Sequence, residues 1–274
     1  MRVGAALFCI AGLLAPAAPA STLKPETVAA FDRYVELAEK RMDAELQDGQ
    51  FLFPDSLPAD AREEAYASMK RGQVYVAPLQ TLDAGQKIKV RGGLIHDWVG
   101  VMFIPRHSVA DVVAVLEDYP DETKIYWPDI QAAKVISHQD RDFVIYLRMY
   151  SKSIVTVVYD ANFAVHNRDY GPDRAGSRSY STRIAEIADP GEPDEHELPV
   201  GNDHGYMWRL NSYWRIEQKD GGVYVQIESI ELSRTIPTEL RIFFGFIVDN
   251  FPRKSITHLL VQTRNGVLNP MTPK

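Results

Sequence analysis

The stretch from Gly92 to Ser233 constrains the fold more than any other, because it repeats one pattern. β-branched and aromatic runs with an apolar residue at every second position alternate with short polar turns, over 95–104, 132–138, 142–150, 153–165, 178–187, 206–218 and 222–233. This period indicates strands with one face buried. Asp220-Gly221-Gly222 joins the last two runs and is a strong hairpin signal. Consecutive strands with tight turns pair with their neighbours, so the sequence predicts an antiparallel meander.

Helical patterns stand at both ends of this meander and in its first connection. Apolar residues recur at spacings of three and four over 25–47, a shorter helix is predicted over 59–70, and Ser108 caps a helix that runs to Tyr119. Pro252 lacks an amide hydrogen, so we expect a short helix over 240–248, a break, and a terminal helix from Pro252 to about Leu268. The predicted fold is α+β: an antiparallel β-meander wrapped around a long C-terminal helix, a helix-grip, with an N-terminal helical extension.

The first twenty residues have the features of a secretory signal peptide. Arg2 precedes an apolar run that ends at Leu14, and small residues precede an expected cut after Ala20. We therefore expect segments 1–20 (signal peptide), 21–91 (helical extension), 92–268 (main domain) and 269–274 (tail), with the protein periplasmic or secreted. An uncleaved N-terminal anchor stays open as an alternative. Cys9 is the only cysteine and leaves with the signal peptide, so no disulfide staples the mature chain.

Charge excludes some classes of partner. The chain carries a formal net charge of −7 and has no basic run, and removal of Arg2 leaves −8. Nucleic acids and anionic membrane surfaces are bound by clustered Lys and Arg, so neither is an expected partner. A soluble protein, monomeric rather than oligomeric, is predicted.

Residues 235–260 carry more apolar bulk than a surface helix needs. Glu239, Arg241 and Asp249 exclude a membrane span. Two interpretations stay open. The segment is buried between the N-terminal helix and the sheet, or it is a lid that makes transient membrane contact through Phe243, Phe244 and Phe246.

Several short motifs follow one another in a recognisable order. Trp98-Val99-Gly100 stands in the first strand, Asp118-Tyr119 ends the next helix, Tyr126-Trp127-Pro128 follows it, and 251–255 (FPRKS) opens the terminal helix after the meander. In this order the chain, from about Gly92 to Leu268, resembles the START-like (SRPBCC) superfamily, the helix-grip fold of lipid-transfer START domains, Bet v 1-like allergens and polyketide cyclases. The resemblance implies an apolar tunnel between sheet and terminal helix that takes a hydrophobic or amphipathic small molecule such as a lipid. The N-terminal extension is not part of the minimal superfamily domain.

The apolar faces of the strands and the terminal helix supply the residues that would line this cavity. They are Phe143, Ile145, Leu147, Val157, Tyr159, Phe163, Trp208, Leu210, Trp214, Val225, Ile227, Ile256, Leu259 and Leu260. Large aromatics with a polar tip suit a pocket wall, and they suit an ordinary core equally well. For each residue the core interpretation stays open.

Polar residues decide between a binding protein and an enzyme. Asp97, Arg209 and Glu228 are the predicted polar groups of the cavity, and His96, Arg183, Glu186 and Glu231 are further candidates. In an apolar cavity such groups would have perturbed pKa values and could serve general acid/base chemistry of the cyclase/aromatase kind. Alternating charges on neighbouring strands also form ladders on an exposed sheet face.

No nucleophile or nucleotide motif of the GxSxG, P-loop or GxGxxG kind is present. The acidic loop around Asp194–Glu197, with Asp203 and His204, is interpreted as solvated rather than metal-binding. We therefore predict no catalytic residue, metal or cofactor. The favoured hypothesis is an exported protein that carries or senses a hydrophobic or lipid-like molecule, and the alternative is the cyclase/aromatase-type enzyme. A third hypothesis is a structural or interaction protein whose own side chains fill the cavity.

Overall fold

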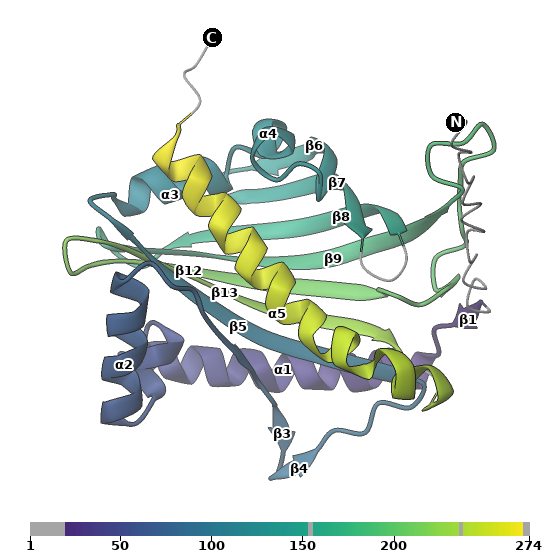
Figure 1. Ribbon diagram of the computed structural model, residues 1–274, viewed down its shortest axis with the longest axis horizontal. Helices are drawn as coiled ribbons and strands as arrows, with labels where there is room; N and C mark the ends of the chain where they lie inside the picture. Colours follow the sequence, from purple (N-terminus) through teal and green to yellow (C-terminus); the bar gives the residue numbers. More distant parts are fainter. Residues whose placement is uncertain (1–19, 153–155, 236–237, 271–274) are drawn as a thin grey trace, which may run out of the picture.

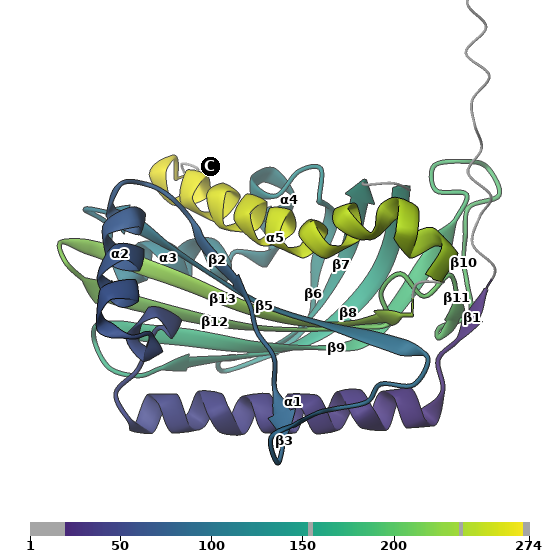
Figure 2. The same cartoon turned by 60° about the horizontal axis from the view of Figure 1, so that its bottom comes forward.

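The protein is built in three layers, with one large sheet between two long helices. The computed structural model describes residues 20–152, 156–235 and 238–270, and for 238–252 it describes the backbone alone. Helix α1 (Pro25–Gln47) lies along one face of the sheet and α5 (Thr238–Leu268) crosses the other (Figures 1 and 2). We call the face under α1 the outer face and the face under α5 the inner face.

The large sheet is antiparallel throughout, with the strand order β2-β5-β13-β12-β9-β8-β7-β6, and β10 pairs with β9. Its strands are β2 (Tyr75–Pro78), β5 (Gly93–Pro105), β6 (Ile130–Gln139), β7 (Asp142–Lys152), β8 (Thr156–Asp169), β9 (Arg174–Ala188), β10 (His196–Glu197), β12 (Arg209–Lys219) and β13 (Gly222–Arg234). Two small ladders pair β1 (Ser21–Thr22) with β11 (Asn202–Asp203) and β3 (Leu82–Asp83) with β4 (Gln86–Lys87). The predicted meander is confirmed from β6 to β13.

The first long strand returns to the end of the meander. β5 pairs with β13 along its whole length, from Gly93↔Arg234 to Pro105↔Gly222. β2, which comes from the segment 21–91, adds an edge strand beside β5. The N-terminal segment therefore contributes both a covering helix and a strand to the main sheet.

Shorter helices fill the connections. They are α2 (Ala59–Lys70), α3 (Val109–Leu116), α4 (Glu122–Ile125) and the single 3-10 turns Phe53–Ser56 and Tyr119–Asp121. Ser108 caps α3 as expected: its Oγ accepts a hydrogen bond from the Asp111 amide at 3.2 Å, and the Asp111 carboxylate accepts from the Ser108 amide. The boundaries predicted for α1 and α2 are confirmed at both ends.

The predicted break at Pro252 is wrong, because α5 is one helix from Thr238 to Leu268. A proline inside a helix removes one hydrogen bond and crowds one carbonyl, and a long helix can absorb this locally. The C-terminal part of α5 is also held from outside, since it packs against β5, α3, α4 and β13. Tertiary packing here outweighs the local preference of proline.

Gly100 lets α5 approach the sheet closely. A Cβ at this position would lie 2.3 Å from Cγ2 of Ile256 and 2.9 Å from Cδ1 of Leu260, well inside van der Waals contact. The glycine in Trp98-Val99-Gly100 thus has a packing role, and it fixes where the helix crosses β5.

Two groups of predictions fall outside the described residues. The predicted signal peptide lies there except for Ala20, and so does the tail from residue 271. The side chains of Phe243, Phe244 and Phe246 also lie outside the description, although their backbone belongs to α5. Among the described helices, none combines the length and the hydrophobicity that crossing a membrane requires.

Candidate functional site

The two faces of the sheet are packed differently. On the outer face, the β13 residues Gln226, Glu228 and Ile230 are 2%, 3% and 0% exposed. The neighbouring inner-face residues Ser229 and Glu231 are half-buried. The same contrast holds along β12 and β5. Over β5, β12 and β13, solvent therefore reaches part of the inner face, while α1 and residues 51–70 cover the outer face. On β8 the order is reversed, since the inner-face Phe163 is buried and the outer-face Asn162 is half-buried.

The exposed part of the inner face is a compact group, which we call the inner patch. It consists of Trp98, Leu210, Ser212, Trp214, Ser229 and Glu231, all half-buried. The strand register places them side by side: Trp98 and Ser212 both lie opposite Ser229, and Leu210 lies opposite Glu231. Two indole rings and a leucine surround small hydroxyl side chains, so the patch combines apolar walls with a polar floor.

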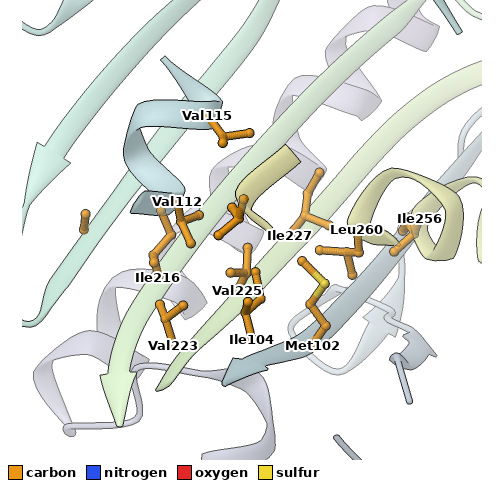
Figure 3. Packing of buried hydrophobic residues seen from close by; sticks show 12 residues of the cluster. Met102, Ile104, Val112, Val115, Ile216, Val223, Val225, Ile227, Ile256 and Leu260 are labelled. Atoms are coloured by element: carbon orange, nitrogen blue, oxygen red, sulfur yellow. The ribbon is translucent and has the colours of Figure 1, made fainter. Parts of the chain in front are cut away.

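One end of the inner face is a close-packed core. Val225 and Ile227 of β13 meet Ile256 and Leu260 of α5, together with Met102, and all are 5% exposed or less (Figure 3). Trp214 and Leu259 pack against this cluster and are only partly buried. Four residues predicted to line a cavity are thus packed against protein, and Trp214 connects them to the inner patch.

The other end of the inner face holds a second apolar cluster. It contains Ile145, Val157, Tyr159 and Phe163, with Phe143, Leu147 and Leu210 packed against it. These seven residues were predicted for the cavity, and the structure brings them together on β7, β8 and β12. Leu210 belongs both to this cluster and to the inner patch.

Glu231 is the carboxylate of the inner patch. Its strand neighbours are His96 on β5 and Leu210 on β12. Burial raises its pKa from the ordinary 4.5 to about 7, because removal from water disfavours the charged form. The His96 ring is engaged beside it, with Nε2 3.2 Å from Oγ of Ser233.

A second acidic group lies further along the inner face. Glu186 lies opposite Tyr159, and its Oε1 is 2.5 Å from Nδ1 of His204. Burial raises the pKa of Glu186, and the hydrogen bond from His204 opposes this shift. The pKa of Tyr159 is raised by burial first and then by the negative charges of Glu186 and Glu231. The electrostatic environment at Tyr159 is therefore set mainly by acidic groups.

Asp97 and Glu228 do not reach the inner face, contrary to the prediction. The Tyr34 hydroxyl of α1 donates to Asp97 Oδ2 at 2.8 Å, and Arg41 of α1 pairs with Glu228. Burial raises the pKa of Asp97, and the neighbouring Glu228 raises it further. Successive strand residues point to opposite faces, and the phase of these two residues brings them under α1. They help to dock α1.

Trp208 and Arg209 are also placed away from the inner patch. Trp208 packs with Phe31, Tyr34 and Leu232 in the cluster under α1, and its indole Nε1 donates to Asp203 Oδ1 at 3.0 Å. The prediction extended the strand alternation to Trp208, but β12 begins only at Arg209. Arg209 shares the outer phase of Asn211 and donates to the Trp208 carbonyl.

The polar floor was missed by the sequence analysis as a feature. Ser179, Ser212 and Ser229 face one another across β9, β12 and β13, because Ser212 lies opposite both of the others. Ser212 and Ser229 each interrupt an apolar alternation, which is a weak signal in one strand. Only the strand register shows that the three serines lie side by side.

No constellation for a metal or cofactor is built from the described residues. Within 20–152, 156–235 and 238–270, no three His, Cys, Asp or Glu side chains gather closely enough to hold a metal ion. In the acidic loop, Glu195 pairs with Arg148 at 2.9 Å and Glu197 pairs with Arg183. These carboxylates tie the loop to the sheet.

Comparison with known proteins gives likenesses of structure only. No protein-family model and no curated protein matches the sequence. The chain is similar to a STAR-related lipid transfer protein from Xanthomonas axonopodis (TM-score 0.44, 16% identity, 71% of this chain and 99% of that one). It is also similar to human STARD10 (0.46, 11%, 78% and 81%) and to an aromatase/cyclase from a Streptomyces species (0.35, 11%, 65% and 96%). Identities and TM-scores are low, so the case for a function has to come from this chain's own residues.

Proposed function

We propose that the protein binds a hydrophobic or amphipathic small molecule, such as a lipid, on the inner face of its sheet beneath α5, and carries or senses it. The main support is the difference in solvent exposure between residues on the inner and the outer face of the sheet. Over β5, β12 and β13 the outer-face residues are mostly buried under α1 and residues 51–70, whereas Trp98, Leu210 and Trp214 keep accessible surface on the inner face. Apolar side chains that solvent can reach inside a fold favour an apolar ligand.

The arrangement of apolar groups supports this assignment. Leu210 joins the inner patch to the cluster around Tyr159 and Phe163, and Trp214 joins it to the cluster around Val225 and Ile227. A ligand seated on the patch would have apolar contacts at either end. The predicted signal peptide would place this activity in the periplasm or outside the cell.

The acid/base alternative loses its predicted residues. A reaction in the ligand site needs a titratable group that touches the ligand, and Asp97 and Glu228 are buried under α1 on the opposite face. Glu231 does lie in the inner patch, where a single carboxylate can hold a ligand by a hydrogen bond without a reaction, so we favour binding.

A space-filling substitution on the patch floor tests the proposal. Ser212→Phe places a ring where ligand atoms would lie, so we expect the loss of bound ligand without a large loss of stability. Protein purified without detergent is measured by native mass spectrometry, before and after incubation with a lipid extract. We expect an added mass on the wild type and at least about a tenfold lower occupancy in the variant.

Thr182→Phe is the matched control, because Thr182 is exposed and lies on β9 outside the patch. Its occupancy should equal that of the wild type. If the wild type stays apo under all conditions, or if Ser212→Phe loads as well as Thr182→Phe, the inner face is not the binding site.

A further inference from the structure

The carboxylate of Glu231 in the inner patch indicates what kind of polar group the ligand has at its end. Glu231 has no hydrogen-bond or ion-pair partner within the part of the chain that the structure describes. The residue keeps some accessible surface, and the protein around its carboxyl group raises its pKa. A half-buried carboxylate without a partner loses part of its hydration, and a ligand that donates a hydrogen bond to it would compensate for that loss.

Within the described residues, the strand neighbours of Glu231 do not donate a hydrogen bond to its carboxylate, so the carboxylate can accept one from a ligand. His96 is directly opposite on β5, but its ring lies against Ser233. On β12 the opposite residue is Leu210, which offers only an apolar side chain. The next position along β13 on the inner face is Ser229, whose side chain is small.

Acidic groups contribute negative charge at this place. The charges of Glu186, Glu231 and Asp203 raise the pKa of Tyr159, while His204 lies beside Glu186 and Asp203, and His96 lies opposite Glu231. The inner patch itself contains no Lys or Arg. Such negative charge attracts a positive or hydrogen-bond-donating group and repels an anion.

We propose that the polar end of the ligand is a hydrogen-bond donor, a hydroxyl or an ammonium group, which Glu231 accepts, and that carboxylate and phosphate ends are disfavoured. This inference rests on the proposed function and narrows its ligand class to neutral or cationic amphiphiles. The alkyl or ring portion lies along Trp98 and Trp214. The hydroxyls of Ser212 and Ser229 provide further polar contacts beside the donor.

Three unbranched ligands of ten carbon atoms each allow the end groups to be compared. Decanol, decylamine and decanoate are titrated into the delipidated full chain by isothermal titration calorimetry at about pH 8, where Glu231 is mostly ionised. We expect decanol or decylamine to bind at least about tenfold more tightly than decanoate. The tighter of the two identifies the donor as hydroxyl or ammonium. Equal or tighter binding of decanoate overturns the proposal and leaves the proposed function standing.

Glu231→Gln tests the residue itself, because it removes the charge at nearly constant volume. We expect its preference for decylamine over decanoate to fall by about tenfold. Glu217→Gln is the matched control: Glu217 is a buried glutamate of β12 on the outer face, paired with Arg174, and its removal should leave the ranking unchanged. An unchanged ranking in Glu231→Gln contradicts the proposal. If none of the three ligands binds the wild type and no ligand co-purifies, both the proposal and the proposed function fail. The order of the three affinities is measured on the wild type alone, so it tests the proposal even if Glu231→Gln does not fold.

Discussion

Adjacent residues in this protein have opposite surroundings, because a strand presents them to opposite faces. Asp97 receives a hydrogen bond from Tyr34 of α1, while His96 faces the inner side next to Ser233. Arg215 on the outer phase is 6% exposed and donates to Glu45 of α1 and to two backbone carbonyls. The chemistry of each side chain follows from the layer that it meets.

Glu122 in α4 gives a prediction at this scale. Its Oε2 is buried without a partner in the described part of the chain, and burial raises its pKa from 4.5 to about 8. Between these two values the folded protein keeps a proton that the unfolded chain releases, so rising pH favours unfolding. Glu122→Gln should therefore stabilise the protein by about 4 kcal/mol near pH 8 and by almost nothing near pH 4.

Urea unfolding of wild type and variant at both pH values measures this difference. Asp60→Asn on α2, an exposed residue, is the control and should leave the free energy of unfolding unchanged at either pH. A variant that is equally stabilised at low and high pH would mean that the ionisation of Glu122 is not the cause.

At the scale of elements, the contact between α5 and β5 depends on one glycine. Gly100→Ala pushes a methyl group against Ile256 and Leu260, so the helix or the strand must shift. We expect a loss of about 1–3 kcal/mol in the free energy of unfolding. Ile256→Ala removes the nearest atom, so the double variant should be at least about 1 kcal/mol more stable than the sum of the single changes predicts. Chemical denaturation of the wild type, the two single variants and the double variant measures this coupling. If the changes in the free energy of unfolding simply add, the close approach of α5 to Gly100 is contradicted.

At the scale of the whole molecule, the N-terminal segment is part of the main structure. Phe31 of α1 packs with Ile230 and Leu232 of β13, and β2 pairs with β5. Phe31→Ala should lower stability by about 3–5 kcal/mol, because it opens a cavity in a fully buried cluster.

Because α1 and the sheet share this cluster, we expect one unfolding transition, coincident by far-UV circular dichroism and tryptophan fluorescence, in both wild type and Phe31→Ala. Asp32→Ala, the exposed neighbour, is the control and should change stability little. Early loss of helix in the variant, before the fluorescence changes, would show that α1 unfolds as a separate unit.

Local patterns in the sequence were enough to predict the elements. The spacing of apolar residues predicted α1 at its observed ends, the shorter helix α2 was also predicted with its observed bounds, and the period of two with the turn at Asp220 predicted the hairpin of β12 and β13. These signals are local, since each depends on residues a few positions apart. The START-like resemblance added the arrangement of a sheet around its C-terminal helix, which the structure has.

Only the tertiary structure decided which sheet face meets which helix. Alternation says that Asp97 and Trp98 point opposite ways, but it does not say that α1 covers one and α5 the other. For that reason Asp97, Glu228 and Trp208 were predicted for the ligand site and lie under α1 instead. Packing of α5 against the sheet likewise allows the helix to continue past Pro252 without a break. The serine floor and Glu231 form one patch only through the register of four strands, which is a property of the folded sheet.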